Sequence, residues 1–233
     1  MKKVVIIALL TGFYHDVHSQ VKEVNVTSAI GNSQGSVSAL VQHDWELWKS
    51  KKFAIGVGAR FTSYFGANQY YITAPAKLTS GSTGPQVIFK ENIDANIDTF
   101  LVKSPQVNLL NLLLNLRYKF NEKFTVGFNI DAIGFSFGGS KHGNYINGAQ
   151  GAMENAKPTS FNVLLISDND KGSLNSELYV KYYWNEKWGA KVGAQFLFTE
   201  YTTDTDVQQF PEPNDRFRNK SFLVAAGVTY KLK

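Results

Sequence analysis

The chain has 233 residues, of which 43% are hydrophobic, 14% aromatic and 18% charged, and its formal net charge at pH 7 is +5. The lack of cysteine excludes disulfides and thiolate chemistry, and after the N-terminus no apolar run is long enough for a transmembrane helix. The charges are spread along the sequence, so no basic block predicts a nucleic-acid site.

The first predicted element is a secretory signal peptide over residues 1–19. Lys2 and Lys3 precede an apolar stretch, and a small residue, Ser19, stands just before the expected cleavage point. The alternative is a buried N-terminal strand, which the two lysines disfavour. Cleavage after Ser19 leaves one domain, 20–233, with a net charge of +4, because two lysines and one aspartate leave with the signal.

Eight segments with alternating apolar and polar residues follow, and each predicts a β-strand with two different faces. They cover 21–31, 34–48, 53–73, 104–120, 124–140, 172–185, 188–203 and 216–233. The alternation slips at Ala132-Ile133, which predicts a β-bulge. No segment predicts a helix.

Three short turns join these strands at one end of the expected sheet. Two of them are near copies, with a polar turn between two aromatic residues: 120–124 reads Phe-Asn-Glu-Lys-Phe and 184–188 reads Trp-Asn-Glu-Lys-Trp. The turn at 48–53 is a looser third copy. Long connections, at 74–103 and 141–171, lie at the opposite end. This asymmetry is typical of a β-barrel in the outer membrane.

Large apolar side chains share one face of each strand, and small or polar side chains share the other. The interior of an eight-stranded barrel is narrow, so we expect the small and polar face inside. Aromatic residues beside the tight turns would form an interfacial girdle; they are Trp45, Phe53, Phe120, Phe124, Trp184, Trp188 and Tyr230. The alternative is a soluble barrel of the lipocalin type, with its apolar face around a ligand.

The polar face collects charges of both signs. They are Glu23, Asp44, Glu46, Arg60, Arg117, Lys119, Asp131, Glu177, Lys181, Lys191 and Lys231. A charge in a narrow, partly dry interior is costly unless it is paired, so we expect cross-barrel ion pairs that plug the lumen. The alternative is a water-filled path lined by charge.

The signal segment, the paired Asn-Glu-Lys turns, the alternating strands and the terminal run 224–233 resemble the small eight-stranded outer-membrane barrels, the group that includes the OmpA transmembrane domain, OmpX and OmpW. The resemblance is one of pattern and covers essentially the whole chain after the signal. It implies an all-β fold: an eight-stranded antiparallel up-and-down transmembrane β-barrel with short periplasmic turns and long extracellular loops, in the outer membrane of a Gram-negative bacterium. It also implies recognition by the barrel-insertion machinery, although the chain ends on Lys233 where the group usually ends on an aromatic residue.

The long loops hold the remaining candidate residues. The run 161–166 predicts an extension of the sheet, with adhesion or contact with a partner protein as the alternative. Arg216, Arg218 and Lys220 are expected to pair with lipopolysaccharide phosphates. A cluster of acids nearby, Asp204, Asp206, Glu212 and Asp215, lacks the spacing of a calcium loop.

Lipid A chemistry would need a histidine beside a serine near the outer leaflet. His142, with Ser136 and Ser140, is the candidate for this chemistry, but residue type without geometry is weak support. We therefore expect no catalytic residue, no cofactor and no metal site, and we expect that the protein is not an enzyme.

The expected function is that of an outer-membrane barrel with a largely plugged polar lumen, in a structural or interaction role through its extracellular loops or as a subunit of a larger envelope complex. A small porin-like channel for polar or amphipathic solutes is the first alternative, and a lipid A-modifying enzyme is the second. The expected partners are outer-membrane lipid, lipopolysaccharide, the barrel-insertion machinery and other envelope proteins.

Overall fold

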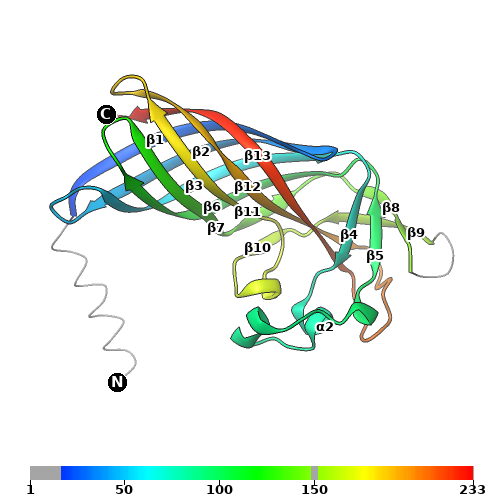
Figure 1. The fold of residues 1–233 in the computed structure, drawn as a ribbon. Coiled ribbons are helices and arrows are strands. Elements are labelled where there is room, and N and C mark those ends of the chain that lie inside the picture. Colours follow the sequence, from blue (N-terminus) through cyan, green and yellow to red (C-terminus); the bar gives the residue numbers. More distant parts are fainter. Residues whose placement is uncertain (1–16, 148–151, 233) are drawn as a thin grey trace.

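The long strands of the chain close on themselves. The structure, a computed structural model, describes residues 17–147 and 152–232. Its eight long strands are β1 (Val17–Gly31), β2 (Gln34–Leu47), β3 (Phe53–Gly66), β6 (Gln106–Lys119), β7 (Phe124–Phe137), β11 (Leu174–Tyr183), β12 (Trp188–Thr203) and β13 (Arg216–Leu232). Each pairs antiparallel with the next, and β13 pairs back with β1, so together they form a barrel (Figure 1).

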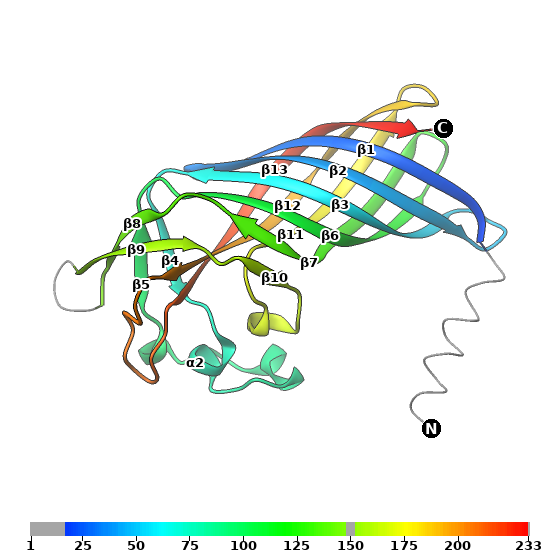
Figure 2. The ribbon, with the colours of Figure 1, turned by 180° about the vertical axis from the view of Figure 1, so that it is seen from behind.

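Five short strands add to this barrel: β4 (Gln69–Thr73), β5 (Thr99–Val102), β8 (Lys141–Tyr145), β9 (Ala152–Pro158) and β10 (Phe161–Val163). The sequence predicted eight strands, whereas the sheet has 13. The predicted single strand 53–73 is wrong, because the chain leaves β3 after Gly66 and β4 pairs with β13 instead. Strands β9, β8, β5 and β4 link β12 to β13 in that order and so form a second, smaller closed circuit (Figure 2).

The two ends of the barrel differ as the sequence predicted. One end, called here the turn end, carries the three tight turns and the C-terminal end of β13 (Figure 1). The other, called the loop end, carries the second circuit and the long connections. Residues 1–16 of the predicted signal peptide lie outside the described residues, as does Lys233, and β1 begins at Val17.

Short helices occupy the long connections, where the sequence predicted none. They are α2 (Ala76–Ser80), the 3₁₀ turns η2 (Pro85–Phe89) and η3 (Asp94–Asn96), and the 3₁₀ turn η4 (Ser167–Asn169). Both α2 and η2 contact η4, so the two long loops pack together beside the barrel (Figure 1). Within the described ranges, no helix has the length and apolar character that a membrane crossing requires.

Two local predictions are confirmed by the strand register. The pairing of β6 with β7 shifts between Leu112 and Leu113, with Ala132 as the extra residue of the predicted bulge. The first half of the run at 161–166 extends the sheet, because Phe161 to Val163 pair with the part of β7 that lies above β11, and the chain leaves the strand after Val163.

The paired turns share one mechanism. The side-chain oxygen of Asn121 accepts hydrogen bonds from the backbone N–H groups of Lys123 and Phe124, both at 2.9 Å. Asn185 accepts the same two bonds from Lys187 and Trp188, at 2.9 and 2.7 Å. Asparagine mimics a backbone turn in this way, which explains why it recurs at both positions.

Candidate functional site

The outward face of the barrel is a belt of exposed apolar side chains. On β6, Leu110, Leu112, Leu114 and Leu116 are 48–58% exposed. The outward positions of β12 run from Trp188 to Phe198, which spans about 25 Å at the usual rise and tilt of a barrel strand. That height matches the apolar band of a transmembrane barrel.

Aromatic side chains ring this belt at the turn end. Ring centroids lie 4.7–5.6 Å apart in the pairs Trp188–Tyr230, Phe124–Tyr182, Tyr118–Phe120 and Trp48–Phe53. All seven predicted girdle residues lie here, with Trp45 tilted against His43 at 4.7 Å. Trp48, Tyr118 and Tyr182 belong to the same ring, although they were not among the predicted residues.

The turn-end half of the interior holds a network centred on Arg117. Its guanidinium nitrogens lie 3.7 Å from Glu23, 3.4 Å from Asp44 and 3.5 Å from Glu46. Lys181, from β11, pairs with the second carboxylate oxygen of Glu23. Each acid in this layer therefore faces at least one basic group.

The loop-end half of the interior is organised around Arg60. Its Nε donates to Asp131 at 3.1 Å, and its Nη1 donates to Asn129 at 2.7 Å. The same Nη1 lies 3.8 Å from Glu177, which also accepts a bond from Lys191 at 2.8 Å. This layer joins β3, β7, β11 and β12 across the interior.

The structure buries nine of the eleven predicted interior charges to 6% exposure or less; they are Glu23, Asp44, Glu46, Arg60, Arg117, Asp131, Glu177, Lys181 and Lys191. The barrel shields these side chains from solvent, so ion pairs occupy the interior at this level. The other two lie at the turn-end mouth. Lys119 pairs with Glu122 of the turn at 3.3 Å, and Lys231 lies 3.7 Å from the ring centre of Tyr183.

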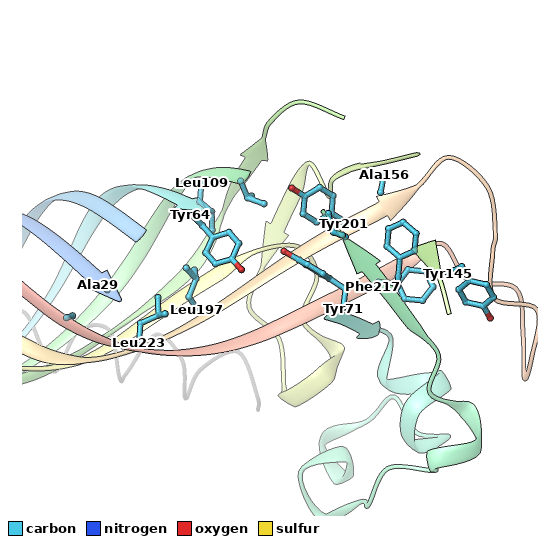
Figure 3. Packing of buried hydrophobic residues seen from close by; sticks show 14 residues of the cluster. Ala29, Tyr64, Tyr71, Leu109, Tyr145, Ala156, Leu197, Tyr201, Phe217 and Leu223 are labelled. Atoms are coloured by element: carbon cyan, nitrogen blue, oxygen red, sulfur yellow. The ribbon is translucent and has the colours of Figure 1, made fainter. Parts of the chain in front are cut away.

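Packed aromatic and aliphatic side chains close the interior at the loop end. Tyr64, Tyr71, Leu109, Leu197 and Tyr201 are all 0% exposed, and their cluster continues into the second circuit (Figure 3). The rings of Tyr71 and Tyr201 meet edge to face at 5.2 Å. The Tyr71 hydroxyl lies 3.0 Å from Thr199 Oγ1, so the buried polar atom is satisfied.

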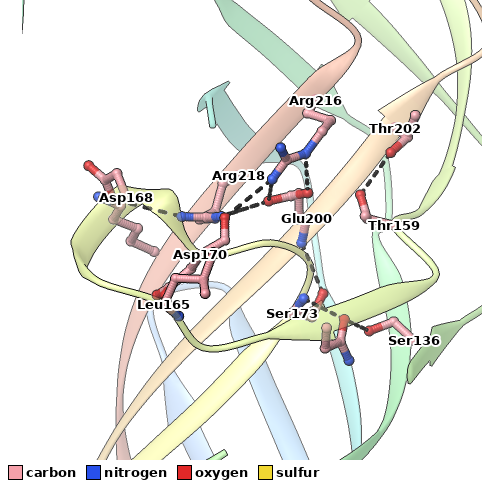
Figure 4. Close-up of polar contacts among 12 residues, drawn as sticks. Ser136, Thr159, Leu165, Asp168, Asp170, Ser173, Glu200, Thr202, Arg216 and Arg218 are labelled. Atoms are coloured by element: carbon pink, nitrogen blue, oxygen red, sulfur yellow. Dashed lines mark hydrogen bonds and ion pairs between the residues drawn. The ribbon is translucent and has the colours of Figure 1, made fainter. Parts of the chain in front are cut away.

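Sequence reasoning missed a second ionic cluster, which lies on the outer wall of the barrel. Glu200 of β12 accepts bonds from Arg216 and Arg218 of β13, each at 2.8 Å (Figure 4). The loop that holds η4 folds over them, and its Asp168 lies 2.6 Å from Lys220. A signal was present, because Glu200 has the same strand parity as the outward-facing Phe198.

This cluster changes the interpretation of the loop-end arginines. The sequence predicted that Arg218 would meet lipopolysaccharide phosphates. In the structure Arg218 is only 1% exposed, and its guanidinium contacts Glu200, Asp168 and the backbone carbonyl of Asp170. Burial raises the pKa of the Asp170 side chain, which accepts a bond from the backbone N–H of Leu165 at 2.6 Å. The contacts hold loop 164–172 against the wall as a strap.

Ser136 and His142, two of the candidates for catalysis, lie in different surroundings. Ser136 is buried on β7 and donates to Asn162 at 2.9 Å, whereas His142 is exposed on β8. Glu212 of the acidic loop pairs with Lys77 at 2.6 Å. In the part of the chain that the structure describes, no three His, Cys, Asp or Glu side chains converge as metal ligands.

No family model and no curated protein matches the chain. Its antiparallel barrel is similar in fold to solved outer-membrane β-barrels. They include Neisserial surface protein A (9% identity, covering 91% of this chain and 96% of that one, TM-score 0.36) and the attachment invasion locus protein Ail of Yersinia pestis (7%, 92% and 99%, 0.36). A de novo designed transmembrane β-barrel is also similar (10%, 93% and 99%, 0.36). Identities and TM-scores this low do not assign a function.

Proposed function

We propose that this chain is an integral outer-membrane β-barrel protein of a Gram-negative bacterium, with a plugged interior and an ordered interaction surface at its loop end. One observation carries the proposal: the barrel is apolar outside and charged inside. Leu112 is 58% exposed, whereas Arg60, Lys181 and Asp131 are at most 1% exposed. Hydrocarbon around the barrel makes this distribution favourable, because lipid covers the leucines and the sheet encloses the charges.

The plug supports a structural or interaction role over a porin-like channel. Ion pairs occupy both halves of the interior, and the Tyr71–Tyr201 cluster fills the mouth at the loop end. A path for polar solutes would require both layers to move.

The loop end supplies the surface for interaction. The second circuit shares the buried cluster of the loop end through Phe100 and Phe217, and Arg218 and Lys220 hold the strap to the wall. Large apolar side chains stand out from this framework, among them Phe89 at 87%, Phe210 at 66% and Met153 at 64% exposure. A rigid platform with exposed apolar groups suits contact with another envelope protein or a host surface.

Single-channel recording in planar bilayers tests the plugged interior. We expect no steady openings from protein whose insertion is verified by heat-modifiable migration on gels. Steady openings from inserted protein would favour the channel. Loop-end partners are tested by pull-down from detergent-extracted envelopes, with the loop-end apolar residues replaced by serine as the matched control.

A further inference from the structure

Folding sorts the charges of the chain into layers that the sequence does not show. The interior holds five buried acids and four buried bases, and the loop end holds eleven acids and nine bases. The described part of the turn end is different, with eight lysines against two glutamates, Glu122 and Glu186. The positive charge of the protein is therefore concentrated at the turn end.

Six of these lysines are exposed and encircle the barrel; they are Lys22, Lys49, Lys51, Lys52, Lys123 and Lys187. They come from β1 and from all three tight turns. Four of the turn lysines are sequence neighbours of a girdle aromatic residue: Lys49 follows Trp48, and Lys52, Lys123 and Lys187 precede Phe53, Phe124 and Trp188. These lysines thus stand beside the girdle residues, at the turn-end edge of the apolar belt.

Few of the eight turn-end lysines form an ion pair with an acid of the chain. Counting only residues in the ranges 17–147 and 152–232, the ion pair at the turn end is Lys119–Glu122. At the loop end, by contrast, four of the nine bases have carboxylate partners; they are Lys77, Arg216, Arg218 and Lys220. The side chains of Asn121 and Asn185 accept hydrogen bonds from the backbone N–H groups of Lys123 and Lys187, so two of the three turns present their lysines in a defined position.

We propose that this lysine ring binds the anionic headgroups of phospholipids in the inner leaflet of the outer membrane. The inference rests on the proposed membrane location. A ring suits lipids, which approach the barrel from every side, whereas a protein or polymer would favour a patch on one side. Lysine stems can lie along apolar surface while the ammonium reaches the headgroup phosphates, and basic residues beside a membrane attract anionic lipid.

The four tryptophans of the chain, Trp45, Trp48, Trp184 and Trp188, all lie at the turn end, so selectively excited tryptophan fluorescence reports on this site alone. The protein is inserted into phosphatidylcholine vesicles that contain the same fraction of either brominated phosphatidylglycerol or brominated phosphatidylcholine. We expect the anionic quencher to be preferred by about fivefold at an engaged lysine. The preference should fall in about 1 M salt, where the Debye length is about 3 Å.

Two variants with equal charge change locate the effect. The turn-end variant carries K49Q, K51Q, K52Q, K123Q and K187Q, and the control carries K77Q, K90Q, K103Q, K157Q and K171Q at exposed loop-end positions. Both brominated lipids should quench the tryptophans of the turn-end variant equally. In the control variant, quenching by the anionic lipid should stay preferred, as in the original chain. Heat-modifiable migration confirms that both variants are folded.

Three results separate the possible failures. Equal quenching of the original chain by both lipids overturns the inference and leaves the membrane barrel intact. The same result together with salt-sensitive binding to isolated peptidoglycan sacculi assigns the ring to the cell wall and also overturns it. No quenching by either brominated lipid contradicts the proposed membrane location itself.

Discussion

Replacing Arg60 with methionine tests whether the interior is dry and held by ion pairs. Arg60 is 1% exposed, and it contacts Asp131, Asn129 and, at 3.8 Å, Glu177. R60M leaves the Asp131 carboxyl group buried without its counter-ion, with only hydrogen bonds from the Asn111 side chain at 2.7 Å and the Asn175 backbone at 3.0 Å. Breaking a buried pair in this way costs about 3–5 kcal/mol of unfolding free energy.

The double variant R60M/D131N removes the stranded charge as well. We expect it to regain about 2 kcal/mol relative to R60M, because an uncharged amide needs no counter-ion. Urea unfolding in phospholipid vesicles, followed by tryptophan fluorescence, measures both values. The matched control is K119M at the partly exposed mouth, with an expected loss of about 0–1 kcal/mol. A loss below about 1 kcal/mol for R60M, with no rescue by D131N, would mean that water screens these charges and that the plug is wrong.

Three further predictions concern the belt, the turns and the strap. L112K places a charge in the middle of the apolar belt and should cost about 2–4 kcal/mol of unfolding free energy in vesicles; a change near zero would show that water, not lipid, meets this face. N185A removes the two hydrogen bonds that the Asn185 side chain accepts from backbone N–H groups, and it should lower the unfolding free energy by about 1–2 kcal/mol. N121A should have the same effect, and an unchanged unfolding free energy in both variants would refute the shared turn mechanism. E200Q weakens the bonds that position Arg216 and Arg218, which donate to the Asp170 carbonyl of the strap, so trypsin should cleave after Lys171 faster than in the original chain; an unchanged rate would show that other contacts hold the loop.

Local patterns were sufficient to predict the long strands and their faces. Alternation along β6 assigns Leu112 outward and Arg117 inward without any knowledge of the partner strands, because the side-chain period of a strand is two residues. The same alternation assigned to the inward face all nine charged residues that the structure buries in the interior. Their individual partners were not predictable, since Arg60 and Asp131 meet only through the register of β3, β6 and β7.

The loop end shows where this reasoning stops. Strand β4 is continuous in pattern with β3 but pairs with β13, more than one hundred residues away in sequence. Strands β5, β8 and β9 are too short to show a period and take their form from one another. The lysine ring is not visible in the sequence for a similar reason, because its members are spread over four regions of sequence and are gathered only when the barrel closes.

Spin labelling along β12 tests the central claim most directly. The chain has no cysteine, so each single-cysteine variant carries one nitroxide. In vesicles, labels at Ala190, Val192, Ala194 and Phe196 should collide with oxygen dissolved in the lipid, and labels at Lys191 and Gln195 should be shielded from oxygen and from a water-soluble nickel reagent. A label at Val192 or Phe196 that collides mainly with the nickel reagent, or one at Lys191 that is open to lipid, would contradict a barrel with hydrocarbon outside and paired charges within.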